Sequence, residues 1–264
     1  VLEVNLLPSF ARCASMAGLA REIAAITGKA FSLAAQLPLT FKPTTEYVEL
    51  EITTPDLNPR FMAGLIRNVT PGASPALVQR RLKAAGMRQI NNIVDATNYV
   101  MLALGQPLHA FDYDVLVKRA KGKGVKIITR GAKAGETLTT LDGVDRKLDS
   151  STTLVCDTAG ALSIAGVMGG AESEVTAETK NILLEAASWN MINIRKTARA
   201  QNLPSEASYR YSRGVHPSMA EKGLRLALEL MAQWTGGEVE PEAADNYPLP
   251  PKPAVVEITA RDVY

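Results

Sequence analysis

Four short apolar runs lie between residues 125 and 187: VKIITR (125–130), TTLVCDT (152–158), LSIAGVM (162–168) and NILLEAA (181–187). Runs of this length, separated by Gly- and Asp-containing turns, are typical of strands joined by short connections. We therefore predict that this stretch forms β-sheet.

Upstream, EYVELEI (46–52) and FMAGLIRNV (61–69) are further strand candidates. Helix patterns, begun by capping residues and ended by glycines, stand between and after the strands. Because the two kinds of element interleave irregularly, we expect an α+β fold, with mixed sheets in a layered, sandwich-like core and flanking helices, and not a doubly wound sheet. The predicted helices cover residues 74–86, 91–104, 188 onward and 217–237.

Both ends of the chain differ from this central region. VLEVNL (1–6) predicts a strand, and Leu19, Ile23 and Ile26 predict a helix that ends at Gly28. QLPLTFKPTT (36–45) and EPEAADNYPLPPKP (240–253) are Pro-rich and are interpreted as linkers, and AVVEITARDVY (254–264) as the start of a strand. Together with the absence of an initiator Met, this predicts an excised fragment with boundaries at 1–45, 46–238 and 239–264.

Composition limits the classes of function. Hydrophobic residues make up 46% and charged residues 21% of the 264 residues, with a net charge of +2. This balance does not favour a protein that holds nucleic acid by bulk charge, so an RNA contact requires a local patch or a partner. The absence of a signal peptide and of an apolar run near 18 residues predicts a cytoplasmic protein without a membrane segment.

The sequence lacks the residues of several common kinds of catalytic site. Cys13 and Cys156 are far apart and form no CxxC, so free buried thiols are expected and a structural zinc site is not. His109 and His216 are the only histidines, and neither belongs to an HExxH motif or follows a GxSxG elbow. No phosphate loop is present either. Any chemistry must therefore rely on orientation and activation of water.

NIVDATNYVMLALGQPLHAFD (92–112) combines polar residues with a mostly apolar helix. Gly105 and Pro107 end the helix and present His109, so Asn98 and His109 are candidates to converge at the helix end and hold a water. The alternative is structural: Asp95 and Asn98 cap turns, and His109 bonds to backbone in a buried corner.

Two further motifs have a functional and a structural interpretation. Gly166, Gly169 and Gly170 follow a predicted strand, where glycines allow backbone N–H groups to approach a ligand or simply permit a tight hairpin turn. Glu185 follows three apolar residues. A carboxylate there is costly to bury without a partner, so it either receives a ligand hydroxyl or occupies an edge position facing solvent.

RKTARAQNLPSEASYRYSRGVHP (195–217) is the one basic stretch with interleaved aromatic residues. It has the composition of a surface that contacts a phosphate backbone or stacks on a base. The alternative is a solvated helix face with structural arginine pairs. Its basic residues are Arg195, Lys196, Arg199, Arg210 and Arg213, and Ser205, Glu206 and Ala207 lie in its turn.

Jointly these motifs resemble one family. NYVM, GQPLHAFD, TLDG, AGVMGG, LLEAA and SEASYRYSRGVHP occur in the order and spacing of bacterial phenylalanyl-tRNA synthetase beta subunits, over about residues 61–237. LAREIAAITG (19–28) resembles the preceding segment of that subunit. LLPSFARC (6–13) stands where the family usually has a TPNR-like stretch. The resemblance implies the end of a preceding domain (1–45), an editing domain (46–238), and a linker with the start of the next domain (239–264).

The resemblance implies a function as well: hydrolysis of mischarged Tyr-tRNA(Phe). ATP- and Mg-dependent aminoacylation would belong to an alpha subunit in a heterotetramer, no cofactor is expected in this chain, and the tRNA acceptor end would be the substrate. The alternative is a non-catalytic module for tRNA docking or for the subunit interface. By motif, Thr97, Asn98 and His109 are assigned to the ester and its water, Gly166 and Glu185 to the tyrosine hydroxyl, and Gly169, Ser205 and Ala207 to the substrate pocket.

Overall fold

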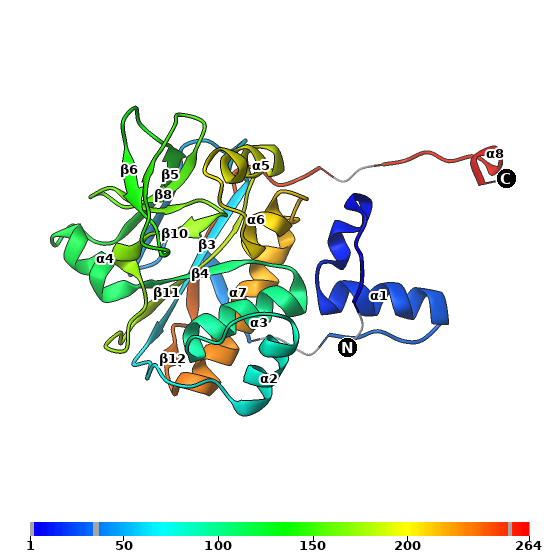
Figure 1. Cartoon of the computed structure of the whole chain (residues 1–264), viewed down its shortest axis with the longest axis horizontal. Helices are drawn as coiled ribbons and strands as arrows, with labels where there is room; N and C mark the ends of the chain where they lie inside the picture. The colour runs from blue at the N-terminus through cyan, green and yellow to red at the C-terminus, as the bar shows by residue number, and fades with distance from the viewer. Residues whose placement is uncertain (1–2, 34–36, 253–254, 264) are drawn as a thin grey trace.

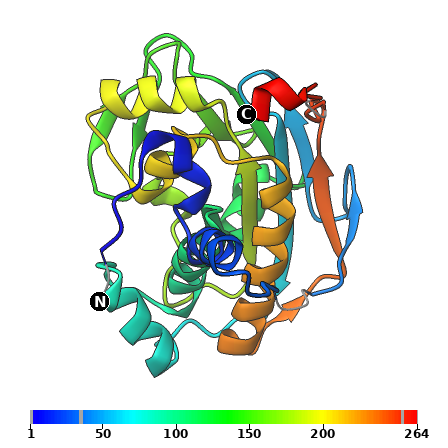
Figure 2. The same cartoon turned by 90° about the vertical axis from the view of Figure 1, so that its right-hand side faces the viewer.

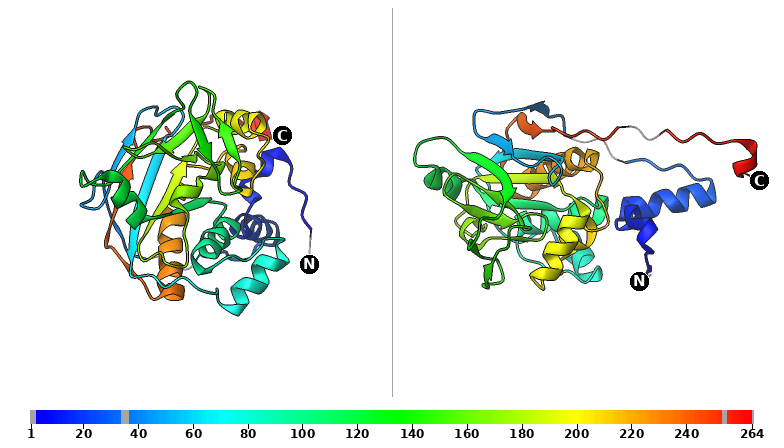
Figure 3. Two further views of the ribbon diagram at one scale, coloured as in Figure 1. Left: turned by 60° about the vertical axis from the view of Figure 1, so that its left-hand side comes forward. Right: turned by 90° about the horizontal axis from the view of Figure 1, so that it is seen from above.

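The computed structural model describes residues 3–33, 37–252 and 255–263. It is an α+β fold, as predicted, with helices and mixed sheets in layers (Figure 1). One large sheet lies in the middle, a second sheet packs on one of its faces, and helices cover the other face (Figures 2 and 3).

The central sheet, here called sheet A, is built around two strands that are apolar along almost their whole length. Such runs are typical of strands buried on both faces. β3 and β11 are paired antiparallel from Arg60 and Ser188 to Ile66 and Ile182. The strand order is β1 (Thr40–Lys42), β13 (Glu242–Asn246), β3 (Arg60–Arg67), β11 (Ile182–Ser188) and β4 (Leu108–Asp112), and β12 (Glu238–Val239) also pairs with β3.

The second sheet, sheet B, contains the other strands predicted from the central stretch. VKIITR, TTLVCDT and LSIAGVM each contribute a strand here, whereas NILLEAA forms β11 of sheet A. The order in sheet B is β10 (Met168–Gly169), β9 (Ala161–Ile164), β8 (Thr153–Cys156), β5 (Lys126–Gly131) and β2 (Glu49–Ile52), and β6 (Thr137–Thr139) pairs separately with β7 (Asp145–Lys147).

Side chains alternate across sheet A, as strand geometry requires. On β3, Phe61 and Leu65 belong to the apolar core shared with sheet B, whereas Met62 and Ile66 belong to the core shared with the helices. Position along a strand therefore decides which layer a residue contacts.

Two helices form most of the other layer. α3 (Asn92–Leu104) begins where the Asn91 side chain accepts hydrogen bonds from Ile93 and Val94 N–H, and it ends at Gly105, whose φ is +84°. α7 (Ser218–Thr235) packs against α3 and against β3 and β11. The remaining helical segments are η1 (Pro8–Cys13), α1 (Met16–Thr27), α2 (Ala76–Ala84), α4 (Tyr113–Ala120), η2 (Ala171–Ser173), α5 (Met191–Ala200), α6 (Glu206–Tyr211) and α8 (Ala260–Val263).

Both predicted linkers were wrong as descriptions of structure. Each contains a strand of sheet A: β1 lies within the first and β13 within the second, and the two pair with each other in parallel. β13 also pairs with β3, and Arg60 of β3 forms a two-pronged hydrogen bond with Asp245, at 2.9 and 2.7 Å. Local Pro content hid these strands, because long-range pairing outweighs local propensity.

The predictions for the chain ends were also partly wrong. Within residues 3–6 of VLEVNL no strand forms, and 255–263 of AVVEITARDVY contain α8 in place of a strand. The helix over Leu19 and Ile26 was confirmed as α1, which Gly28 ends at φ +66°. Part of its apolar side is exposed, since 82% of Ile26 is accessible.

Two predicted helix starts shift. Ser74 does not cap α2, because its hydroxyl donates to Asp95 at 2.6 Å. Ser188 remains in β11, and α5 begins only after Asn190, whose side chain accepts from two backbone N–H groups. Cys13 and Cys156 are buried and free, as predicted. Among the described helices, none is long and apolar enough to cross a membrane.

Candidate functional site

His109 and Glu185 lie directly opposite each other on neighbouring strands. β4 and β11 are antiparallel, and their register pairs Glu185 with His109. Paired positions in an antiparallel sheet point to the same face, with Cβ atoms about 5 Å apart. Their neighbours Phe111, Leu183 and Ala187 belong to the core shared with sheet B. Both polar side chains therefore point from sheet A toward sheet B.

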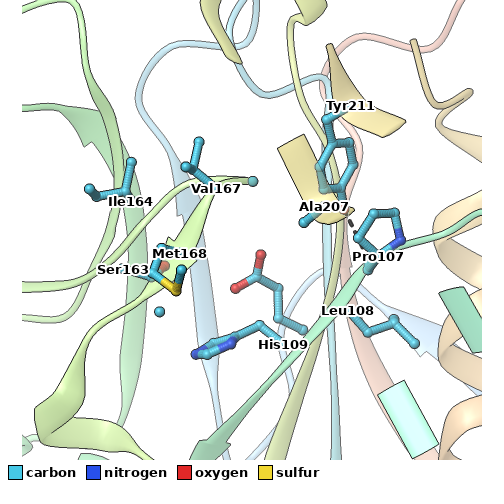
Figure 4. A pocket seen from close by; sticks show the side chains of 12 residues that line it. Pro107, Leu108, His109, Ser163, Ile164, Val167, Met168, Ala207 and Tyr211 are labelled. Carbon is cyan, nitrogen blue, oxygen red and sulfur yellow. Dashed lines mark hydrogen bonds between the residues drawn. The ribbon is translucent and has the colours of Figure 1, made fainter. Parts of the chain in front are cut away.

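A small pocket lies between the two sheets at this point. It has a volume of about 70 Å³ and is walled by β4 and β11, by the β9–β10 hairpin and by α6 (Figure 4). His109 points into it from β4, with Met168 across from it. The lining residues are Pro107, Leu108, His109, Ser163, Ile164, Gly166, Val167, Met168, Gly169, Glu185, Ala207 and Tyr211.

Glu185 is a buried carboxyl without compensation. Only 7% of the residue is exposed, and its buried Oε2 atom has no hydrogen-bond partner among the described residues. Burial raises the pKa of Glu185 to about 8, because a charge is unfavourable in an apolar surrounding. The solvent-facing edge position was the wrong alternative, since β11 lies between β3 and β4.

His109 has a similarly uncompensated ring. Within the part of the chain that the structure describes, its buried Nε2 atom has no hydrogen-bond partner, although the residue as a whole is partly exposed. The ring stands edge-on to Phe111, with centroids 4.5 Å apart. Burial lowers the pKa of His109 to about 4, so the ring is neutral near pH 7. The two groups thus form a neutral polar pair in an apolar pocket, suited to an apolar ligand that carries a hydroxyl.

The glycines of the AGVMGG motif form a tight hairpin turn and also shape the pocket. Val167 N–H bonds to Ile164 at 3.0 Å, and Gly166 has a φ of +66°, which favours glycine. The glycines approach protein atoms closely: a Cβ on Gly166 would lie 2.8 Å from Trp189 Cδ1, and one on Gly169 would collide with the His109 ring. The hairpin interpretation was confirmed.

The serine and the alanine of the α6 turn have different roles. Ala207 lines the pocket. Ser205 is not among the lining residues. It caps α6 by accepting from Ser208 N–H, and its hydroxyl donates to Val167 O at 2.8 Å. Ser205 therefore fastens the β9–β10 turn to α6 and contacts the pocket only through that turn.

Thr97 and Asn98 do not converge with His109 in the pocket. Neither is among its lining residues, and both lie within α3. The buried residues of α3 pack with Ala110 and Leu184, on the face of sheet A opposite to His109. The Thr97 hydroxyl donates to Val94 O at 2.7 Å within the helix. The expected meeting of Asn98 and His109 at the helix end is thus not observed.

Part of the basic stretch has structural partners. Arg210 is buried and donates to Ala14 O and to Glu206. Arg213 lies 3.7 Å above the Tyr209 ring, and Arg195 donates to Ser212 O. Structural pairing therefore accounts for these arginines, while Lys196 and Arg199 are exposed on α5.

Sequence reasoning missed several lining residues. Met168 and Ser163 belong to the predicted strand LSIAGVM, but no local signal indicates which face they occupy. Tyr211 could have been found, because it lies four residues after Ala207 and so shares its helix face.

Comparison with known proteins identifies the class. The sequence profile of the B3/4 domain family matches residues 57–236, which include the whole pocket lining. The chain therefore belongs to the B3/4 domain family. It is 47% identical over 259 residues to the phenylalanine–tRNA ligase beta subunit of Moorella thermoacetica, and 45% identical over 250 residues to that of Desulfotalea psychrophila. The resemblance carried by the motifs is thus confirmed.

These matches cover most of this chain but a smaller part of its relatives. They span 98% and 93% of this chain, but only 32% and 29% of the two beta subunits. The chain thus spans about a third of their length. Among solved structures, an N-terminal fragment of the phenylalanyl-tRNA synthetase beta subunit from Pyrococcus horikoshii matches 87% of this chain and 60% of that one, at 14% identity and a TM-score of 0.46.

Proposed function

We propose that this chain is a proofreading module that hydrolyses the ester of Tyr-tRNA(Phe). The observation that carries this proposal is the unpaired Oε2 of Glu185 in an apolar pocket, beside the unpaired Nε2 of His109. Buried polar atoms without partners are rare in folded proteins, and a functional ligand is one physical reason to keep them. The beta subunits that this chain resembles supply the substrate class.

Selectivity follows from the cost of leaving such groups unpaired. An apolar pocket built for phenylalanine rejects an added hydroxyl weakly, by roughly 100-fold in comparable cases. A site with buried polar groups rejects the analogue without the hydroxyl by about 10⁴-fold or more, because those groups then stay unpaired. Glu185 is such a group, because the tyrosine hydroxyl pairs with its carboxyl whereas phenylalanine leaves the carboxyl unpaired.

The protonation state of Glu185 suits a phenol. With its pKa raised to about 8, the carboxyl keeps its proton near pH 7 and can donate one hydrogen bond and accept another. The Gly166 turn borders the same pocket. A dry cavity of about 150 Å³ holds benzene, and this pocket has about 70 Å³. A phenol ring therefore requires a lining side chain to move, and the flexible Met168 is the most suitable.

We assign the ester to the outer end of the pocket, near His109. The His109 ring lies close to Gly169, and a Cβ on Gly169 would also lie 2.9 Å from Leu141, which is an exposed residue. This end of the pocket is therefore nearer the surface than Glu185, which is buried. His109 then orients a water whose oxygen attacks the ester carbonyl. The bond to the ribose oxygen breaks, and that oxygen receives a proton. Orientation alone can supply a large part of the rate.

The other activities of the relatives lie outside this proposal for the chain. We expect aminoacylation, with its ATP and Mg, to reside in an alpha subunit, and the two subunits to form a heterotetramer that holds the tRNA and presents its acceptor end. Thr97 and Asn98 are not needed for the reaction proposed here, since α3 packs on the opposite face of sheet A.

The test is single-turnover deacylation with the chain in excess over Tyr-tRNA(Phe) or Phe-tRNA(Phe). We expect faster release of tyrosine than of phenylalanine. Ala207→Trp fills the pocket and should abolish this difference. A module for docking or for the subunit interface would leave both esters at the rate of the uncatalysed control, and that result would disprove the proposal.

A further inference from the structure

Two buried side chains meet just beyond the His109–Glu185 pair. Gln106 is fully buried, and its Nε2, which carries two hydrogens, lies within hydrogen-bond distance of three acceptors: Pro107 O at 2.8 Å, Ala187 O at 3.0 Å and the Tyr211 hydroxyl at 3.0 Å. Its Oε1 has no hydrogen-bond partner among the described residues. The Tyr211 hydroxyl lies 2.9 Å from Pro107 O and 3.1 Å from Ala187 O. Both side chains thus form hydrogen bonds with the same two backbone carbonyls.

The position of this contact has a backbone cause. The register of β4 and β11 runs from Asp112–Ile182 to Leu108–Ala186, so Pro107 and Ala187 would form the next pair. Proline has no N–H and cannot continue the ladder. Without another donor, two buried carbonyls would remain unpaired, which is costly. Gln106 and Tyr211 supply the donors that the backbone lacks.

The same two residues contact both layers around sheet A. The Tyr211 ring lines the pocket, and a Cβ on Gly166 would lie 3.1 Å from it. On the other side, a Cβ on Gly223 of α7 would lie 2.5 Å from Gln106 Cγ. A glycine in the middle of a helix is unfavourable, and here it makes room for Gln106.

We propose that Gln106 and Tyr211 are positioning residues: they close the end of the β4–β11 ladder and so hold His109 and Glu185 opposite each other in the pocket. His109 lies two positions after Pro107, and Glu185 lies two positions before Ala187, so loosening this end moves both functional side chains. The Tyr211 hydroxyl is directed at the carbonyls, as the dashed line to Pro107 in Figure 4 indicates, and so it acts through His109 and Glu185 and not on the substrate.

The experiment compares matched pairs of variants. Gln106→Leu removes the shared donor, and Gln79→Leu is its control, because Gln79 Nε2 also donates to a backbone carbonyl, Ser74 O at 2.6 Å, away from the pocket. Tyr211→Phe is matched by Tyr113→Phe, since the buried Tyr113 hydroxyl donates to Tyr47 O at 2.8 Å.

Two readouts separate positioning from simple loss of stability. The first is the maximal single-turnover rate and the half-saturating concentration for Tyr-tRNA(Phe), and it rests on the proposed function. The second is NMR titration of the His109 ring in the free chain, which needs no substrate. If wild type does not hydrolyse the ester, the proposed function fails, but the titration still tests this inference.

We expect Gln106→Leu to lower the maximal rate roughly 10-fold and Tyr211→Phe roughly 3-fold, the size of one weakened neutral hydrogen bond or less. The half-saturating concentration of Tyr-tRNA(Phe) should change less than about 2-fold, which is smaller than the change expected when one hydrogen bond to the substrate is lost. The pKa of His109 should move up from about 4, as water reaches the ring. Both controls should leave rate and titration unchanged.

Gly223→Ala gives a test that does not touch the pocket. The added methyl presses on Gln106, so the same shift in the His109 titration is expected with a helix that is, if anything, better formed. If Gln106→Leu fails to fold, the results for Gly223→Ala and Tyr211→Phe decide whether the inference holds. Wild-type titration and rate in both of these would overturn the inference, as would equal effects in the controls.

Discussion

Asp95 and Glu185 are both buried carboxyl groups, and their surroundings differ completely. Asp95, in the first turn of α3, is 1% exposed and accepts from Ser74 Oγ at 2.6 Å and from Ile90 N–H at 2.9 Å. Glu185 is 7% exposed, and its Oε2 accepts no hydrogen bond from any residue that the structure describes. One carboxyl ties a loop to a helix start, and the other faces a pocket.

This difference separates a structural carboxyl from a candidate functional one. Burial alone does not, since both are buried. What distinguishes them is whether the surrounding protein supplies donors for the oxygens, because an unpaired buried polar atom costs stability that selection keeps only for a reason. Asp112 follows the pattern of Asp95, since it accepts from Asp114 N–H, Val115 N–H and Thr179.

The largest expected effect is on stability, from an isosteric pair of variants. Asp95→Asn removes the charge from both hydrogen bonds and forces the Ser74 hydroxyl to reverse from donor to acceptor, so we expect a loss of about 2 kcal/mol in the free energy of unfolding. Glu185→Gln loses no hydrogen-bond partner and should change the free energy of unfolding by less than about 1 kcal/mol. Urea denaturation of both measures this. Equal losses would mean that Glu185 is also structural.

The next effect is on selectivity. Glu185→Leu removes the group that we propose to bind the phenol, so the ratio of Tyr-tRNA(Phe) to Phe-tRNA(Phe) deacylation rates should fall by roughly 10- to 100-fold, as expected for losing a hydrogen bond to a buried polar group. Single-turnover assays of both esters give this ratio. Asp95→Asn, assayed below its melting temperature, should keep it. A ratio unchanged by Glu185→Leu would remove Glu185 from the proposal.

A smaller effect is expected in the pH dependence of stability. The folded chain holds the Glu185 proton up to a pKa of about 8, whereas the unfolded chain releases it near 4.5, so this contribution to stability is complete below 4.5 and is lost as pH rises toward 8. His109, with its pKa lowered from 6.5 to about 4, contributes in the opposite direction, since its contribution is lost as pH falls below 6.5.

Above pH 6.5 the His109 contribution is constant, so the slope comes from Glu185 until Cys156, whose pKa burial raises to about 11, begins to contribute near pH 9. Between pH 6.5 and 8 it should lower the free energy of unfolding by about 1.5 kcal/mol, from 1.36 kcal/mol per unit. Glu185→Gln should remove this slope, and Asp95→Asn should not. A wild-type slope that survives in Glu185→Gln would show that other groups cause it.

Much of the fold was predictable because its strands are locally marked. β3 and β11 are apolar runs, and α3 and α7 have clear starts and glycine ends. β13 was not predictable in the same way: EAADN has low strand propensity and forms a strand because β3 and β1 flank it. Pairing between residues about 180 positions apart leaves no local trace.

Several residues of the candidate site were predictable, but their geometry was predictable only in part. His109, Glu185, Gly166, Gly169 and Ala207 lie together, as the motifs implied. Asn98 was expected beside His109 because Gly105 and Pro107 end the helix and present His109. A helix and the strand that follows it present many faces, however, and only the register of β4 with β11 decides that His109 points toward sheet B.

The smallest expected effect comes from His109. An imidazole whose pKa is lowered to about 4 is a weak base near pH 7, so it can place a water but takes up a proton poorly. General-base catalysis typically contributes about 10²- to 10⁴-fold, and we expect His109→Ala to cost less, roughly 10-fold or below. The deacylation rate of wild type should show no inflection near the usual histidine value of about 6.5, measured from about pH 5.5 to 8.5. Glu185 lies directly opposite His109, so an ionised Glu185 would favour a charged His109 ring. Glu185→Gln removes that negative charge, and the His109 ring should stay neutral in this variant. A loss near 10⁴-fold in His109→Ala, together with an inflection near 6.5 that the variant removes, would make His109 the general base and not only a residue that orients the water.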